Sequence, residues 1–199
     1  MPKDTFFNLP DEKKRKLVQA LHKEFSQHPL INASIARIIA TAEIPRGSFY
    51  QYFSDLSDAY FYMFDQQITE VADQLMKILR EERGDIFQSS QYLFSWLLKE
   101  REHFSLLTQA LLNLNGHIHQ AITSVFTIDT EVIFHLQLEV APAPFENKTY
   151  FSHLLRVISA TMIHNFIEAH TQILPLEAAV YNFSQDLQLL NNGHHTVAL

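Results

Sequence analysis

The chain has 199 residues, 47% of them hydrophobic, so it is long enough to bury a core without disulfides or metals. It contains four glycines and seven prolines, too few for the many tight turns of a β-sandwich or β-barrel. It contains no cysteine, which excludes disulfides, thiolate metal sites and cysteine nucleophiles. The sequence shows no secretory signal and no apolar run of membrane-spanning length, which predicts a cytoplasmic protein.

The net charge of −7 is distributed unevenly along the chain. Residues 1–55 hold eight Lys or Arg against six Asp or Glu, whereas residues 56–199 hold seven against sixteen. A mildly basic beginning on an acidic remainder presents one end of a protein to a polyanion and repels it from the rest.

Nearly every segment repeats its apolar residues with the helical period, which predicts an all-α fold. Pro29 ends the first helix, the two prolines of 141–144 form a loop, and the tail from Asn191 onward is expected to fray. The expected helices cover residues 10–28, 34–42, 45–53, 57–82, 86–99, 103–114, 117–138, 147–171 and 175–190.

Residues 33–53 form the most informative segment. Two short helices joined by a tight turn at Glu43-Ile44 are typical of a helix-turn-helix, whose second helix enters the major groove of DNA. Phe49 and Phe53, four residues apart, are expected to face the core. The inward positions of the first helix are expected to be Ile35, Ile38, Ile39 and Ala42.

The remaining side chains of the second short helix suit contact with DNA. Arg46 offers a cation to phosphate or guanine, and Gly47 lets the backbone approach closely. Hydroxyl and amide groups for phosphates and base edges come from Ser48, Tyr50, Gln51 and Tyr52.

Several of these residues also have simpler interpretations. Ser34 is either a plain helix cap or a cap that also touches phosphate, and Arg37 is either a DNA contact or part of a solvated face. The same choice applies to the basic run 13–16, and the two tyrosines could pack rather than bind.

Over residues 8–65 the chain resembles the tetracycline-repressor-like (TetR) transcriptional regulators. The resemblance rests on Ile38, Ala42, Ile44, the Gly47-Ser48 pair, Tyr50 and Phe53, on the basic first helix and on the long fourth helix. It implies a helix-turn-helix DNA-binding domain at 1–56, with the motif at about 33–53, and a helical dimerisation and ligand-binding domain at 57–199. The implied protein is a homodimeric repressor that binds a near-palindromic operator and is released by a small molecule.

Three positions depart from the pattern of that family. Glu43 stands where glycine is usual in the turn, and would be strained by roughly 1 kcal/mol at positive φ. Ile39 replaces the usual alanine, and Leu56 replaces a lysine that grips a phosphate. We expect that phosphate contact to be missing or to be supplied by Lys3, Lys13 or Lys14.

The last two helices carry more apolar surface than one small body needs, which predicts a two-fold four-helix interface with a second copy. The residues expected in that interface are Leu154, Leu155, Ile158, Met162, Phe166, Ala178, Tyr181 and Leu189.

The helices between residues 85 and 138 are rich in aromatic and poor in charged residues, which favours an apolar or aromatic effector. An anionic effector would need Arg101 or Arg156, and a solid core without a pocket is the alternative. The candidate effector contacts are Trp96, Gln109, Asn113, His135 and Asn165.

No cofactor or metal is expected, since the eleven histidines lack ligand spacing and no cysteine assists them. The enzyme motifs of nucleotide and acyl-transfer sites are missing too. A DNA-binding regulator is therefore the preferred function. A helical interaction adaptor that does not bind DNA and an all-α enzyme are the alternatives.

Overall fold

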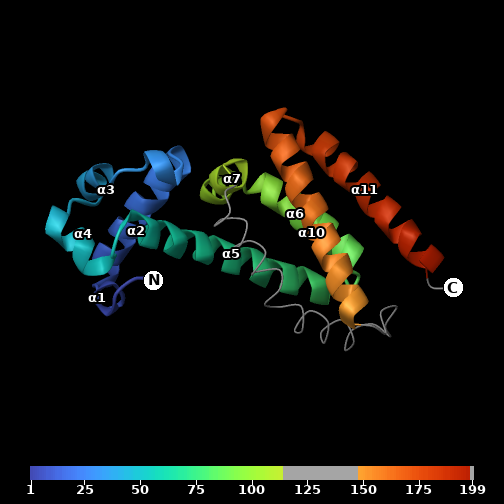
Figure 1. Ribbon diagram of the computed structural model, residues 1–199, viewed down its shortest axis with the longest axis horizontal. Helices are drawn as coiled ribbons and strands as arrows, with labels where there is room; N and C mark the ends of the chain where they lie inside the picture. Colours follow the sequence, from blue (N-terminus) through green and yellow to red (C-terminus); the bar gives the residue numbers. More distant parts are fainter. Residues whose placement is uncertain (114–147, 198–199) are drawn as a thin grey trace. The chain divides into compact units, whose positions relative to one another are not determined.

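The computed structural model describes residues 1–113 and 148–197, with side chains up to residue 192 (Figure 1). Every regular element in these ranges is a helix, so the all-α prediction is confirmed. The expected helix at 117–138, the loop at 141–144 and the candidate effector contact His135 lie outside the described residues.

The described chain divides into two compact units. The first, here called the head, contains residues 1–69 and 102–113; the second, the body, contains residues 70–101 and 148–197. The head thus takes in a later segment besides the helix-turn-helix region expected at 1–56. It includes α7, because that helix packs on α2.

Six helices build the head. They are α1 (Asp4–Phe7), α2 (Asp11–Gln27), α3 (Ile35–Ala42), α4 (Arg46–Tyr52), the first half of α5 (Leu56–Glu81) and α7 (Ser105–Leu112). A 3-10 turn, Leu30–Asn32, follows the break at Pro29. The helix α1 was not expected from the sequence, because four residues are too few for a periodic pattern.

The head core is largely aromatic. Phe25 packs edge-on against Tyr60, with ring centroids 5.1 Å apart, and Tyr60 stacks on Phe64 at 6.3 Å. Burial raises the pKa of Tyr60 to about 12, so its hydroxyl stays protonated. These large rings hold α2 and α5 together behind the two short helices.

Polar groups fasten α7 to the rest of the head. The buried Gln67 of α5 donates to the carbonyl of His103 at 2.6 Å and accepts from the amide of Leu107 at 2.9 Å. The hydroxyl of Ser105 donates to that of Ser26 on α2 at 2.7 Å. The start of α7 is therefore bonded to two helices of the head.

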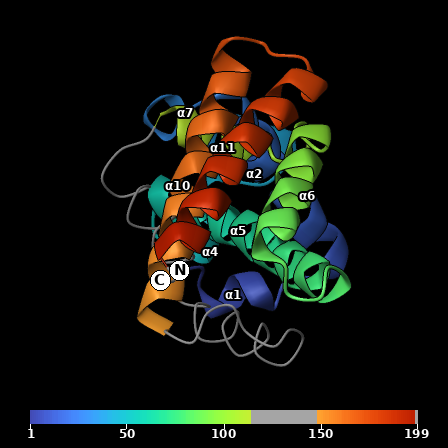
Figure 2. The ribbon, with the colours of Figure 1, turned by 90° about the vertical axis from the view of Figure 1, so that its right-hand side faces the viewer.

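The body contains α6 (Ile86–Lys99), α10 (Lys148–Thr171), α11 (Leu176–Val197) and the second half of α5. Asp85 caps α6 by accepting from the amides of Phe87 and Gln88. Figures 1 and 2 show α10 and α11 side by side, and α11 also packs on α6, where Phe94 meets Phe183 at 4.5 Å. The helix α11 continues to Val197, past the end that the sequence predicted at residue 190.

Most of the residues expected in the dimer interface lie inside the body. Ile158 is only 2% exposed, and its apolar neighbours on α10 are also buried, so this part of the prediction was wrong. Their burial serves the protomer's own core, because α10 packs on both α6 and α11. The α10 residues concerned are Leu154, Leu155, Ile158, Met162 and Phe166.

The described helices include none with the length and apolarity needed to cross a membrane. Nor do the described residues gather three or more His, Asp or Glu side chains into a metal-binding group.

Candidate nucleic-acid interface

The turn between α3 and α4 has the positive φ that the sequence analysis considered for Glu43. Glu43 follows α3 in the left-handed conformation, with φ 56° and ψ 41°. The amide of Ile44 donates back to the carbonyl of Ile39 at 3.1 Å and closes the turn. The strain of roughly 1 kcal/mol expected for a non-glycine residue therefore applies here.

A buried carboxylate fixes the start of α3. Glu24 of α2 is 5% exposed and accepts from the amide of Ser34 at 2.7 Å. It also accepts from the guanidinium of Arg37, from Nη2 at 2.6 Å and from Nε at 2.9 and 3.0 Å. These bonds tie α3 to α2 and determine where the helix-turn-helix begins.

The same bonds affect the ionisation of Glu24. Burial opposes ionisation of the carboxyl, but the bonds from Arg37 and Ser34 outweigh it and lower the pKa of Glu24 below its ordinary value. The carboxylate is therefore charged at neutral pH and remains an acceptor for both donors.

Two sequence-predicted DNA contacts are involved in this arrangement. Ser34 occupies the N-cap of α3, but its side chain makes no capping hydrogen bond, and its amide is the group that bonds Glu24. Arg37 bonds Glu24 and the carbonyl of Asn32, at 2.7 Å, with its guanidinium half exposed. The structure thus gives Arg37 a place in holding α3 that the sequence alone did not indicate.

The helix α4 turns its two phenylalanines inward, as expected. Phe49 and Phe53 are fully buried, with ring centroids 5.6 Å apart. Pro45 precedes the helix as its N-cap residue, with a φ of −61°. Because both inward positions are apolar, the opposite face of α4 is left to solvent.

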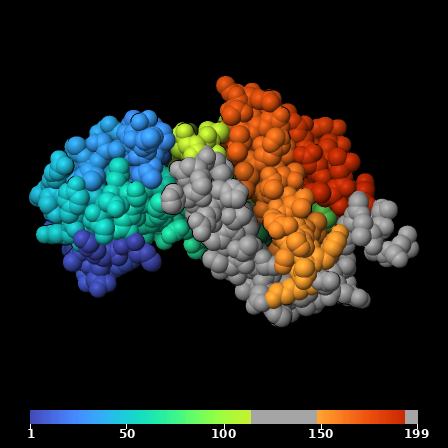
Figure 3. All heavy atoms as spheres, viewed as in Figure 1, coloured from blue at the N-terminus to red at the C-terminus, as the bar shows by residue number. Residues whose placement is uncertain are grey.

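That opposite face carries the predicted DNA-contacting side chains. Arg46, Gly47 and Gln51 are exposed, and Tyr50 is 42% exposed. Ser48 and Tyr52 are half-buried. Figure 3 shows α3 and α4, in blue to cyan, at the surface of the head. Arg46 makes no ion pair with any described residue, so its charge is available to a partner.

Gly47 is informative because nothing in the head requires it. A Cβ placed there would meet no atom within 4 Å, and its backbone does not have a positive φ. Neither packing nor conformation explains a glycine at this exposed helical position. Close approach of an external surface to the backbone of α4 would explain it.

The lysines expected to replace the missing phosphate contact are differently placed. Lys3 donates to the carbonyl of Tyr50 at 2.8 Å, and Lys14 lies 5.2 Å from the ring centroid of Phe6. Lys13 is exposed and makes no ion pair within the described ranges. Leu56 is half-buried at the first position of α5.

Sequence reasoning missed Glu24 and α1. Glu24 lies between Leu21 and Phe25 in the apolar pattern of α2, where a charged residue is unusual. That interruption was a usable signal, although the sequence does not identify the partner. No comparable signal marks α1, which is held by tertiary contacts.

The candidate effector contacts are not gathered in one described pocket. Gln109 and Asn113 belong to the head, where the Asn113 amide donates to the carbonyl of Gln109 at 2.9 Å. Trp96 and Asn165 belong to the body. Asn165 is buried and donates to Asp186 of α11 at 2.8 Å and to the Thr161 carbonyl at 3.0 Å, so its amide joins two helices.

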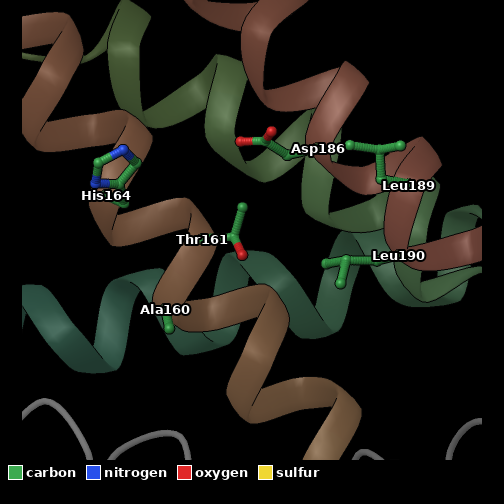
Figure 4. Close-up of a pocket in the computed structure, with 6 residues that line it drawn as sticks. All are labelled: Ala160, Thr161, His164, Asp186, Leu189 and Leu190. Carbon is green, nitrogen blue, oxygen red and sulfur yellow. The ribbon is translucent and has the colours of Figure 1, made fainter. Parts of the chain in front are cut away.

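An open groove of about 490 Å³ runs between α10 and α11 (Figure 4). Its polar groups are a hydroxyl, an imidazole and a carboxylate, and the rest of its wall is apolar. The lining residues are Ala160, Thr161 and His164 from α10 and Asp186, Leu189 and Leu190 from α11.

Comparisons with known proteins agree with this architecture. A TetR family transcriptional regulator from Chloroflexus aurantiacus is 25% identical with a TM-score of 0.53; the match covers 97% of this chain and 98% of that one. The fatty acid degradation regulator FadR from Bacillus halodurans is 16% identical over 90% and 96% of the two chains, with a TM-score of 0.66. The reduced form of Escherichia coli NemR is 17% identical over 86% and 95%, with a TM-score of 0.63. No curated protein matches the chain.

The helix-turn-helix and helical body define a DNA-binding transcriptional regulator. Residues 85–194 match the family described as "Tetracyclin repressor-like, C-terminal domain", which covers more than half of the chain. The chain therefore belongs to the TetR family of transcriptional regulators, as the motif at 33–53 predicted from the other end of the sequence. These regulators are not enzymes, so the enzyme alternative is discarded.

Proposed function

We propose that the protein is a repressor that binds a near-palindromic operator as a homodimer and leaves it when an apolar or aromatic effector binds. The observation that carries the DNA-binding part is the outward face of α4. That face combines an unpaired arginine, a glycine without an internal reason, and exposed hydrogen-bonding groups. Such a helix suits the major groove, where arginine recognises guanine and hydroxyls bind phosphates.

The residues proposed for DNA binding fall into three groups. Arg46, Tyr50 and Gln51 are exposed and extend from α4, so we assign them to base edges or phosphates. Gly47 permits the backbone to approach, and the half-buried Ser48 and Tyr52 contact phosphates at the edge of the footprint. Ser34 and Arg37 contribute chiefly by fixing α3, because both bond Glu24.

The dimer is proposed to form through the outer face of α10 and α11. Tyr181 and Leu189 are 62% and 72% exposed, although both belong to a long helix that packs well on its other side. Val157 and Ala160 of α10 are exposed as well. The groove beside them would receive side chains of a second copy, so that two pairs of helices form a four-helix interface.

Effector release is proposed to act through the α5 helix, which contributes residues to both units. An effector that binds the body in a conformation with wrongly spaced heads shifts the population away from the operator-bound state. The apolar class of effector follows from the aromatic and aliphatic composition of the body helices. Trp96 remains a proposed contact, and so does His135, outside the described residues.

The test is selection of DNA by the purified protein. The protein is mixed with a random duplex pool and with the fragment upstream of its own coding sequence, and bound DNA is sequenced. The proposal expects enrichment of an inverted repeat whose half-sites are about one helical turn apart, and binding that weakens with salt. Failure to enrich any sequence, at any salt concentration that keeps the protein folded, would contradict the proposal.

The effector is tested on the selected duplex. Apolar, aromatic and strongly polar compounds are screened for thermal stabilisation of the protein, and the stabilising compounds are added to the protein–DNA complex. Release by an apolar or aromatic compound is the expected result. Stabilisation by sugars or nucleotides alone would contradict the effector class, and stabilisation without release would contradict the coupling.

A further inference from the structure

The carboxyl end of α4 lacks partners of its own. At the end of a helix the last carbonyls have no intrahelical donor and need one from elsewhere. The amide of Phe53 bonds the carbonyl of Phe49 at 2.9 Å and ends the helical series. The carbonyls of Tyr50, Gln51 and Tyr52 follow, and they are the ones that need donors.

The beginning of the chain supplies all three donors. The amide of Lys3 donates to the carbonyl of Tyr52 and its Nζ to that of Tyr50, both at 2.8 Å. The hydroxyl of Thr5 donates to the carbonyl of Gln51. The charge of Lys3 also lies at the negative end of the helix dipole, where a cation is favourable.

An apolar anchor holds this segment in place. Phe6 is fully buried, with its ring centroid 5.0 Å from that of Phe53 and 5.0 Å from that of Tyr62 on α5. Lys14 of α2 lies over the same ring, 5.2 Å from its centroid. The segment is therefore fixed to α2, α4 and α5 at once, and its donors are held opposite the carbonyls.

A helix of seven residues needs such support, because helices this short are unstable without tertiary contacts. We propose that residues 3–7 form a clamp that positions α4 for DNA, with Lys3 and Thr5 as positioning residues rather than phosphate contacts. The proposal rests on the proposed function insofar as it concerns operator binding. The holding of α4 by the clamp is a property of the free protein.

The first measurement needs no DNA. Thr5→Val removes the hydroxyl and keeps the shape of the side chain, whereas Thr5→Ser keeps the hydroxyl and serves as its control. Amide hydrogen exchange on the full chain is expected to become faster in residues 46–53 of Thr5→Val, while α10 and α11 keep wild-type rates. Thr5→Ser should exchange like the wild type. Unchanged exchange of α4 in Thr5→Val would overturn the clamp, whatever the protein binds.

The second measurement uses the duplex selected by the wild type. Losing one hydrogen bond at α4 should weaken operator binding about 2- to 10-fold per half-site for Thr5→Val, with Thr5→Ser restoring it. Binding to an unrelated duplex should change less, because phosphate contacts do not read sequence. Wild-type operator affinity in Thr5→Val would overturn the positioning role.

The third measurement separates a clamp from a phosphate contact at Lys3. If Lys3 contacted phosphate, Lys3→Ala would reduce the slope of log affinity against log salt by about 0.9 for each lysine lost. The clamp predicts weaker operator binding with an unchanged slope. A shallower slope in Lys3→Ala would overturn the assignment of Lys3.

Discussion

The outward faces of α4 and of the α10–α11 pair differ in chemistry. The outward face of α4 carries the side chains of Arg46, Tyr50 and Gln51, and at Gly47 it has no side chain. The two phenylalanines on the opposite face of the helix are fully buried. The α10–α11 pair exposes Val157, Tyr181 and Leu189, and Leu189 lines an open groove. The first suits a charged partner that accepts hydrogen bonds, and the second suits an apolar surface like itself.

The two units are also stabilised in different ways. In the head, a buried carboxylate that accepts hydrogen bonds from three donor groups fixes α3, and carbonyls at the end of α4 are bonded from outside the helix. In the body, apolar packing between α6, α10 and α11 dominates, and the Asn165–Asp186 bond joins the last two helices. In the head, directed bonds at α3 and α4 supplement a buried aromatic core, whereas apolar packing predominates between the body helices.

The largest expected effect comes from the body. Leu189→Glu places a charge on the proposed interface, so the protein should be monomeric at micromolar concentration by light scattering. Operator affinity should fall by about 10²- to 10⁴-fold, because two joined heads bind far better than one. Ile173→Glu is the control, since Ile173 is 82% exposed in the turn that connects α10 to α11 and does not line the groove. A dimeric Leu189→Glu protein would show that the interface lies elsewhere.

The next effect comes from the head. Arg46→Ala should weaken operator binding by about 1–3 kcal/mol per half-site without changing the melting temperature, because the side chain is exposed and unpaired. Tyr50→Ala should act in the same direction. Lys77→Ala, an exposed cation on the body half of α5, is the control for general charge loss. Two folded head variants that bind like the wild type would refute α4 as the recognition helix.

The third prediction concerns directed bonds in the head. Glu24→Ala removes the acceptor of Ser34 and Arg37, and should lower the free energy of unfolding by about 1–3 kcal/mol. Glu12→Ala, which removes an exposed carboxylate of the same helix, should have almost no effect. Denaturant unfolding measures both. Equal effects from the two variants would mean that Glu24 does not fix α3.

Gly47→Ala should separate stability from function. Alanine favours a helix over glycine by up to about 1 kcal/mol, and nothing within 4 Å opposes its Cβ, so the protein should melt slightly higher. Operator binding should weaken if DNA approaches this backbone. Calorimetry and a binding titration on the same sample give both values, and unchanged or tighter operator binding would count against close approach at α4.

The smallest expected effect is a difference between the body and the head in how stability depends on pH. Burial lowers the pKa of His170 in the body from its ordinary 6.5, so the unfolded chain binds a proton more readily than the folded one. The stability that the neutral His170 gives the body is therefore fully present above about pH 6.5. It decreases as the pH falls toward the pKa of His170 in the folded protein. The pKa of Glu24 is lowered, so the stability that its ionisation gives the head is lost only as the pH falls below its ordinary value of 4.5.

His170→Gln should flatten the decrease of the melting temperature as the pH falls below 6.5, and His153→Gln, an exposed control on the same helix, should not. A wild-type melting temperature that is independent of pH across this window would contradict the assignment.

The sequence predicted the inward positions of the helix-turn-helix at the level of single residues and the body only at the level of helices. Within residues 33–53, spacing alone determines which side chains face inward, and Ile38, Phe49 and Phe53 are buried as expected. On α10, an apolar face that packs inside the protomer has the same pattern as one that covers a second copy. Ile158 was therefore assigned to the wrong surface, since the difference lies in how α6 and α11 pack around it.

Tertiary contacts explain what else could not be predicted. The four residues of α1 carry no periodic signal, and their position depends on Phe53 and Tyr62, far away in the sequence. The role of Arg37 depends on Glu24, thirteen residues earlier on another helix. Both features are bonds between elements, and a linear pattern does not show them.

The attachment of α7 to the head limits how this protein can be divided for engineering. A DNA-reading module cut from the chain at residue 56 would lose Gln67 and Ser105, and would expose the face of α2 on which α7 packs. A chimera that transplants this head onto another sensor must therefore carry residues 102–113 as well. The DNA-binding unit is discontinuous in sequence, since it contains residues 1–69 and 102–113. A recombination point placed directly after the helix-turn-helix would therefore separate segments that fold together.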